Sequence, residues 1–414
     1  MAASALAAAG IDSPDVLRAG RDALSLALMD ARNHTLQLLG AFEQALDDAP
    51  PAGPFPPPLW TAGHIGWFAE FWIGRNTRRA LGPGCPRDAV RLASVDPQAD
   101  RWFDPSLLPA PERAAAGLTS EAVKAYLLDT LETTLELLEK APEDDAALHF
   151  FRLALWHEDL RGEQLVMAAQ HAGVPLPLQL PPGAAAREPV GLPATRWPLG
   201  SREGGFVPAI ERGAQEVAVP AFEIDAQPVG WAQYVEFIDD GGYDRPEFWQ
   251  PAGWDWLQAQ ARGEGRRGPR HVEQIGVASG AVLQTLFGKP TRMAGTQNVM
   301  HATWWEADAY ARWAGRRLPA EVEWEAAAAS AARRGLRWGE VREWMAGTLQ
   351  PIEGYVPDAW APDAELDPQP AFGRARVQRG ASFAARQRMK RTKARYWALP
   401  GDDTAFVGFR TCAL

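Results

Sequence analysis

Cysteine is scarce in this sequence of 414 residues, which contains only Cys85 and Cys412. Two thiols in a chain of this length are typical of a reducing compartment and exclude a fold held together by many disulfide bonds. The N-terminus lacks a basic segment, and no run of about 18 apolar residues occurs, so neither a secretory signal nor a membrane-spanning helix is predicted. We therefore expect a cytoplasmic protein with no membrane partner.

The chain also lacks an excess of positive charge. Its formal net charge is −10, from 52 acidic and 42 basic side chains. A surface that binds nucleic-acid phosphates is normally basic, so nucleic acid is not an expected partner. Tryptophan, by contrast, is abundant, with 18 residues. Its large ring can pack a core or hold a cation, so this abundance is compatible with a binding surface.

A change in composition divides the chain. Apolar residues recur at helical spacing in four stretches, residues 13–48, 59–81, 119–140 and 142–173. Pro, Gly and Ala dominate residues 176–200, as expected for a linker between domains. The prediction is an α+β protein of two domains, with a four-helix bundle over residues 1–175 and a domain of sparse regular structure over residues 201–414.

Signals within the second domain are short and mixed. Strand-like residues occur at 216–224, and helices are predicted over 231–239, 304–314 and 319–332. Residues 258–296 are rich in Gly, Arg and Gln, so we expect a long loop there with at most one helix.

Two histidines lie where apolar side chains would be expected. His157 follows Phe150, Leu153 and Ala154 at helical spacing, so its imidazole should point into the bundle. His64 lies on an earlier helix that is apolar on most sides. An unpaired polar group in an apolar core costs about 1–3 kcal/mol, so each imidazole needs a partner. Each alone could be a hydrogen-bonded core residue, but together they indicate half of a metal site.

Several motifs in the C-terminal half carry a resemblance to a known domain. They are residues 303–327, the Glu-Trp-Met-Ala-Gly stretch at 343–347, the Arg-Gly-Ala-Ser-Phe stretch at 379–383 and the Val-Gly-Phe-Arg end at 407–410. Together they resemble the formylglycine-generating-enzyme-like (sulfatase-modifying-factor) domain, which has a C-type-lectin-like fold. Formylglycine-generating activity itself is not expected, because it uses a pair of cysteines and this domain contains only Cys412.

The N-terminal half resembles a DinB-like four-helix bundle. A bundle of this type followed by such a C-terminal domain is similar to the ergothioneine-type hercynine sulfoxide synthases. That resemblance implies an oxidoreductase that holds non-haem Fe(2+) and uses O2 to join sulfur to the imidazole of hercynine, the trimethylated betaine of histidine.

The resemblance also implies iron ligands. In that family one histidine comes from a His-Ile-Gly-Trp-like helix and two come from a His-Glu-x-x-His-x-Glu helix. His64 and His157 match the first two positions, whereas Arg161 stands at the third. A guanidinium cannot ligate iron, because it stays protonated and offers no lone pair. The third ligand is then water, His34, or Glu163, which would complete a set of two histidines and one carboxylate.

The last part of the chain, residues 391–410, resembles the family's segment that holds the substrates. Trp397 keeps the aromatic position, and its ring can hold the quaternary ammonium of hercynine by cation–π attraction, worth roughly 2 kcal/mol when desolvated. Tyr396 replaces the usual asparagine. Asp402 and Asp403 replace a basic pair, so they would repel a carboxylate-bearing thiol and accept hydrogen bonds from hydroxyls.

With this acidic pair and with Arg161, which is an expected substrate contact, the chain resembles the selenoneine synthases of the same group. Those enzymes join hercynine to a selenosugar. The resemblance implies C–Se bond formation between hercynine and a 1-seleno-sugar, giving a hercynyl selenoxide. The family's proton-donating tyrosine is absent from residues 367–379. Tyr355 and Tyr396 are therefore the candidate catalytic residues, unless a softer selenolate needs no proton donor.

Two alternatives stay open at this point. One is an ordinary hercynine sulfoxide synthase that uses cysteine or γ-glutamylcysteine, against which Asp402 and Asp403 argue. The other is a metal-free binding protein in which His157 packs as a core residue and Arg161 pairs with Glu158. Iron content separates the second alternative from both enzymes, and donor preference separates the two enzymes.

Overall fold

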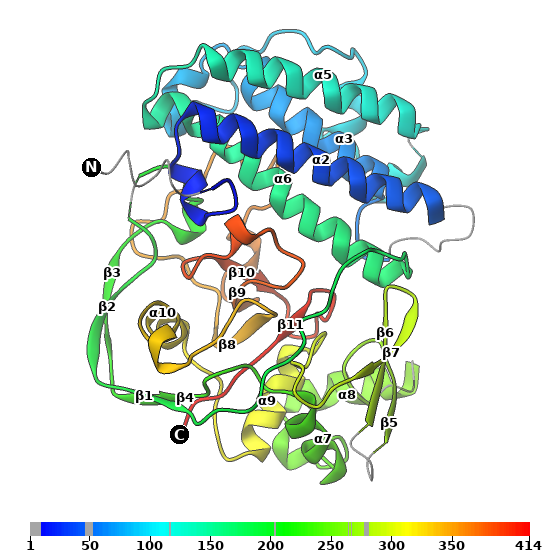
Figure 1. Ribbon diagram of the computed structural model, residues 1–414, viewed down its shortest axis with the longest axis vertical. Helices are drawn as coiled ribbons and strands as arrows, with labels where there is room; N and C mark the ends of the chain where they lie inside the picture. The colour runs from blue at the N-terminus through cyan, green and yellow to red at the C-terminus, as the bar shows by residue number, and fades with distance from the viewer. Residues whose placement is uncertain are drawn as a thin grey trace.

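Four long helices form the N-terminal domain, at the top of Figure 1. They are α2 (Arg21–Ala45), α3 (Pro58–Ala69), α5 (Ser120–Glu139) and α6 (Asp145–Ala172). The short α4 (Ala99–Phe103) lies in the connection between α3 and α5. The structure is a computed structural model, and it describes residues 10–45, 53–115, 117–202, 204–263, 265, 267–276 and 281–414.

The caps of α5 and α6 explain where these helices begin and end. The Thr119 side chain accepts a hydrogen bond from the Ala122 amide, and the Asp144 side chain accepts one from the Ala147 amide. Both satisfy amides that have no partner within the helix. Helix α6 ends at Gly173, whose φ of 72° is the left-handed conformation that favours glycine.

Two of the predicted helices are interrupted in the structure. The first is a 3-10 turn (Pro14–Arg18) followed by α2, because the chain is extended at Ala19. The second ends in a π-turn (Glu70–Gly74). The buried Glu70 carboxylate accepts hydrogen bonds from the Tyr126 hydroxyl, the Ser94 hydroxyl and the Val95 amide, which hold the turn in place.

The C-terminal domain is built around a four-stranded sheet of order β10-β9-β8-β11. Its strands are β8 (Arg342–Thr348), β9 (Arg376–Gly380), β10 (Arg395–Ala398) and β11 (Val407–Gly408). Strand β9 pairs antiparallel with both β8 and β10, whereas β11 is parallel to β8. The helices are α7 (Trp231–Asp239), α8 (Pro251–Gly263), α9 (Trp304–Trp313) and α10 (Glu321–Ser330).

Smaller sheets complete this domain and correct two predictions. Strands β1 (Val190–Leu192) and β2 (Thr195–Leu199) lie inside the predicted linker and pair with β4 (Phe222–Ile224) and β3 (Gln215–Val219). A sheet of β5 (Val272–Gly276), β6 (Ala281–Leu286) and β7 (Lys289–Met293) lies where a long loop was expected. These strands have only three to six residues, so each carries a weak signal in the sequence.

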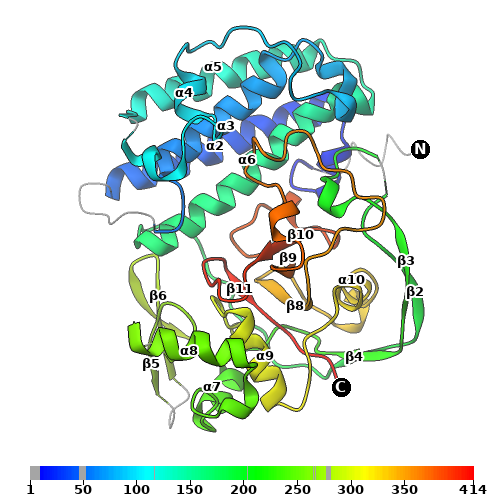
Figure 2. The same cartoon turned by 180° about the vertical axis from the view of Figure 1, so that it is seen from behind.

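Helix α6 lies between the two domains, and both views place it along the edge of the bundle that faces the sheet (Figures 1 and 2). Most of its side chains are buried, which is unusual for a helix of a soluble bundle. The two largest apolar clusters each contain residues of both domains. Among the residues that the structure describes, no helix is long and apolar enough to cross a membrane.

Buried ion pairs also connect the domains. Arg388 of the C-terminal domain donates to both carboxylate oxygens of Asp159 on α6 and to Asp30 on α2. The side chains of Arg388 and Asp159 are each 1% exposed. Removing one member of a buried pair leaves the other charge without compensation, which is costly.

We predict that Arg388→Ala lowers the free energy of unfolding by about 3–5 kcal/mol, because Asp159 would keep a buried charge without a partner. The matched control is Arg245→Ala, which removes an exposed arginine paired with Asp240. This control should cost less than about 1 kcal/mol. Urea denaturation of both variants measures the difference, and equal losses would show that the buried pair does not stabilise the contact between domains.

Candidate functional site

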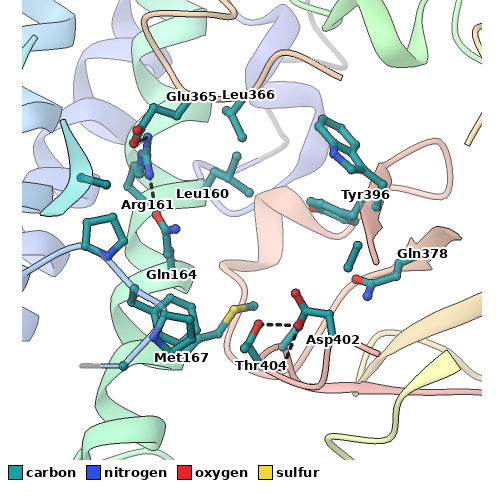
Figure 3. A pocket seen from close by; sticks show the side chains of 18 of the residues that line it. Leu160, Arg161, Gln164, Met167, Glu365, Leu366, Gln378, Tyr396, Asp402 and Thr404 are labelled. Carbon is teal, nitrogen blue, oxygen red and sulfur yellow. Dashed lines mark hydrogen bonds and ion pairs between the residues drawn. The ribbon is translucent and has the colours of Figure 1, made fainter. Parts of the chain in front are cut away.

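A cavity of about 620 Å³ lies between the two domains (Figure 3). Leu160, Arg161, Gln164 and Met167 of α6 lie on one side of it, and β10 with the residues that follow it lies on the other. This volume is in the range of sites that bind small molecules. The two domains therefore form one shared cavity, whose C-terminal wall is the segment expected to hold the substrates.

The two predicted histidines lie together inside the bundle. His64 of α3 and His157 of α6 are buried, and their ring centroids are 5.3 Å apart. His64 Nδ1 is 2.9 Å from the Phe103 carbonyl oxygen, so Nδ1 carries the hydrogen and Nε2 carries the lone pair. His64 Nε2 is buried and has no hydrogen-bond partner in the described part of the chain.

Both imidazoles are held in the neutral form. Burial lowers the pKa of His64 and of His157 well below 6.5, and the charge of Arg161 lowers both further. A neutral imidazole with a free lone pair is the form that ligates a metal. Aromatic rings enclose the pair, with Trp60 stacked on His64 and Phe68 stacked on His157.

Arg161 lies between the histidine pair and the cavity. Its Nε is 3.4 Å from His157 Nε2, while Nη1 donates to Gln164 and Nη2 donates to the Ala364 carbonyl. The guanidinium is buried and also lines the cavity. The metal-free alternative paired Arg161 with Glu158, and the structure corrects this: Glu158 pairs with Arg32 through two hydrogen bonds.

Glu365 is a residue of the site that the sequence did not indicate. Its carboxylate accepts two hydrogen bonds from Arg113, at 2.6 and 3.2 Å, and one from Arg161, at 3.4 Å. Arg113 lies 3.7 Å above the ring of Trp60, which in turn stacks on His64. Arg113 lies in a short 3-10 helix (Ala110–Ala115) and Glu365 lies in a turn, and neither segment has a periodic pattern in the sequence, so only the folded structure brings them together.

Glu163 is not placed with the histidine pair. One of its carboxylate oxygens is 2.5 Å from Arg342 Nη2, and the other accepts a hydrogen bond of 2.6 Å from the Ser382 hydroxyl. His34, the other candidate ligand from the protein, lies close to Gly162. Within the described ranges, no group of three His, Cys, Asp or Glu side chains is close enough to hold a metal ion. Neither Glu163 nor His34 therefore joins His64 and His157 in a group of three ligands within the described ranges.

Tyr396 and Trp397 of β10 both line the cavity. The guanidinium of Arg342 lies 3.8 Å above the Tyr396 ring. Burial raises the pKa of Tyr396 to about 12, although the charge of Arg342 opposes this shift. The Tyr396 hydroxyl therefore stays protonated near neutral pH and can donate a hydrogen bond or a proton.

The structure separates the predicted acidic pair. Asp402 lines the cavity, and its Oδ1 accepts hydrogen bonds from the Thr404 amide and hydroxyl. Asp403 is buried outside the cavity lining and forms a 2.6 Å ion pair with Arg270. The Asp402 amide donates to the Leu399 carbonyl, so Asp402 lies at the end of a turn, and of the two predicted acids only Asp402 lines the cavity.

Tyr355 lies outside the main cavity, in a small adjacent pocket that Tyr396 and Trp397 also line. Its hydroxyl is buried and has no hydrogen-bond partner among the residues described. Burial raises the pKa of Tyr355 to about 12. Of the two candidate tyrosines, Tyr396 is the one that faces the larger cavity.

Comparison with known proteins finds matches to both domains of the chain. Residues 27–174 match the DinB superfamily, and residues 180–339 match the sulfatase-modifying factor enzyme 1-like domain. The chain is 31% identical to the hercynine oxygenase of Mycolicibacterium smegmatis, in an alignment that covers 94% of this chain and 98% of that protein. The chain belongs to the hercynine oxygenase family. It is also 32% identical to the hercynine oxygenase of Mycolicibacterium thermoresistibile, with 94% of each chain covered.

A formylglycine-generating enzyme of Streptomyces coelicolor is 29% identical to this chain, but the match covers only 56% of it. The hercynine oxygenases match almost the whole chain, bundle included. Membership of the hercynine oxygenase family therefore confirms the two-domain fold class and the family that the sequence motifs predicted.

Proposed function

We propose that this chain catalyses the O2-dependent formation of a bond between a chalcogen atom and the imidazole of hercynine, with Fe(2+) held by His64 and His157. One observation carries the proposal: two buried, neutral imidazoles lie directly behind a cavity that both domains line. The full-length similarity to hercynine oxygenases supports hercynine and O2 as substrates.

The residues present fit an iron ion through two protein ligands. A hydrogen bond from Nδ1 to a backbone carbonyl is the usual support of a histidine that binds metal through Nε2, and His64 has this arrangement. At His157 a metal on Nε2 would replace the long hydrogen bond from Arg161. Water and substrate would fill the remaining positions. Fe(2+) bound there would supply the activation of O2.

Residues of the cavity wall would bind and orient hercynine. The Trp397 ring offers a face for the trimethylammonium group by cation–π attraction, and Tyr396 lies beside it on the same wall. The protonated Tyr396 hydroxyl is the favoured proton donor, because it faces the cavity whereas Tyr355 does not. Arg161 is positioned to contact a substrate placed near the histidine pair.

The charges of the cavity favour a neutral donor. Three guanidiniums occur among its described lining residues, and each is already paired with a carboxylate of the chain. Glu365 pairs with Arg113 and Arg161, and Glu163 pairs with Arg342. γ-Glutamylcysteine, with two carboxylates and one ammonium group, would find no unpaired guanidinium among them. We therefore propose a selenosugar as donor, with a hercynyl selenoxide as product on the way to selenoneine.

This reaction balances with O2 as the only oxidant. A C–Se bond replaces the C–H bond of the imidazole and the Se–H bond of the 1-seleno-sugar. One oxygen atom is added to selenium, and the other leaves as water with the two hydrogen atoms. Hercynine sulfoxide synthesis with cysteine or γ-glutamylcysteine has the same balance. It is the second candidate, because the similar proteins named above are hercynine oxygenases.

A competition assay tests the donor. Iron-loaded protein, hercynine and O2 are offered a 1-seleno-sugar, cysteine and γ-glutamylcysteine together, and the products are identified by mass. We expect a selenium adduct of hercynine as the main product. Adducts from the thiols alone would overturn the selenosugar proposal and leave sulfoxide synthesis, and the absence of any adduct would contradict both.

We predict that Trp397→Ala weakens hercynine binding by about 10- to 30-fold, because loss of a desolvated cation–π contact costs roughly 2 kcal/mol. Calorimetry under anaerobic conditions measures the dissociation constant. Trp313→Ala, at a partly buried tryptophan outside the cavity, is the matched control and should leave hercynine affinity unchanged. Equal affinity of the Trp397 variant and the wild type would place the betaine elsewhere.

We also predict that His64→Gln lowers Fe(2+) affinity by more than about tenfold, since even changes around metal ligands have effects of this size. His149→Gln, at a buried histidine of α6 outside the pair, is the control and should retain iron. Arg161→His should raise affinity by adding a third nitrogen ligand. Anaerobic metal titration measures all three variants, and equal iron binding by the His64 and His149 variants would contradict the assignment.

A further inference from the structure

Two buried guanidiniums share one carboxylate at the edge of the cavity, and Figure 3 shows one of them, Arg161, beside Glu365. The side chains of Arg113 and Arg161 are 3% and 5% exposed, whereas that of Glu365 is 31% exposed. Glu365 binds Arg113 through two hydrogen bonds and Arg161 through one. Paired guanidinium groups around one carboxylate are the arrangement by which proteins recognise carboxylate ligands. Here the carboxylate belongs to the chain itself.

We propose that Glu365 is a specificity-determining residue that excludes donors carrying a carboxylate, by occupying the carboxylate site formed by Arg113 and Arg161. This inference rests on the proposed function, because it concerns which donor enters the same cavity. A donor with a free carboxylate would have to displace Glu365 or lie beside its negative charge. An uncharged sugar meets neither obstacle and can donate hydroxyl hydrogen bonds to Glu365 and Asp402.

The backbone of Glu365 supports a fixed position for this carboxylate. Its backbone φ is 51°, a value that residues other than glycine and asparagine rarely adopt. Backbone hydrogen bonds hold the turn, from the Glu365 amide to the Pro362 carbonyl and from the Leu366 amide to the Ala361 carbonyl. An ion pair between Asp363 and Arg87 connects the same loop to the bundle. A strained conformation persists only where its surroundings determine it, so the loop keeps Glu365 on the two arginines.

The test is the binding of γ-glutamylcysteine, the carboxylate probe, to the wild type and to Glu365→Gln, without hercynine and without turnover. The substitution keeps the size and one oxygen acceptor but removes the charge. We expect γ-glutamylcysteine to bind the variant at least about tenfold more tightly, with an affinity that falls as salt is added. Equal affinity for the two proteins in calorimetry would overturn the proposal.

Two further variants make the result specific. Asp402→Asn removes a different carboxylate from the same cavity wall and should have a clearly smaller effect, since the Asp402 carboxylate bonds to the Thr404 amide and hydroxyl. An equal gain in affinity for γ-glutamylcysteine in this variant would show that the effect comes from net charge alone. That result would contradict the role of Glu365. The double variant Glu365→Gln with Arg161→Gln removes one of the two guanidiniums of the carboxylate site, so the gain should be smaller than in Glu365→Gln alone.

The double variant Glu365→Gln with Arg113→Gln removes one of the two guanidinium charges that the single variant leaves without Glu365. It therefore keeps the test open if the single variant does not fold. It should bind γ-glutamylcysteine more tightly than the wild type, through Arg161. No gain there would contradict the proposal. Hercynine affinity is measured in the same series. Loss of hercynine binding in the wild type would contradict the proposed function, whereas retained hercynine binding with unchanged γ-glutamylcysteine affinity would contradict only the role of Glu365.

Discussion

The cost of burying charge organises this molecule around α6. The helix lies between two domains and carries His157 and four charged residues within seven positions, all of them buried or nearly so. Each charge has a partner on a different segment: Glu158 with Arg32, Asp159 with Arg388, Arg161 with Glu365 and Glu163 with Arg342. An unpaired charge there would cost several kcal/mol, so the pairing fixes how the sheet domain is placed on the bundle.

The same pairing determines the character of the cavity. Arg113, Arg161 and Arg342 line it, and each is paired with a carboxylate of the chain, Glu365 for the first two and Glu163 for the third. The histidine pair lies in an apolar, aromatic enclosure that keeps both imidazoles neutral. In the proposed function, this site would hold Fe(2+) through two nitrogen ligands on its inner side, and the cavity wall with its paired charges would face the substrates.

The features predicted from the sequence are those that depend on helical periodicity or on motifs. Four helices, the position of His157 toward the interior and its meeting with His64 follow from helical spacing in an apolar segment. Contacts made outside the long helices were not predicted: Arg113 and Glu365 lie 252 positions apart, in segments without a periodic pattern. Asp402 and Asp403 were predicted together because they stand where the family has a basic pair, but of the two only Asp402 lines the cavity. Glu163 was a candidate iron ligand, but it forms an ion pair with Arg342, which comes from the other domain.

The shared helix has a consequence for how such proteins diverge. The two halves match two separate domain families, as expected for two modules joined in one chain. In the folded chain they share apolar clusters and the buried salt bridges of α6. A bundle transplanted from a relative would bring its own set of interface charges, and it would be accepted only if the complementary residues of the sheet domain moved with it. Recombination between relatives is therefore constrained to inherit both halves together.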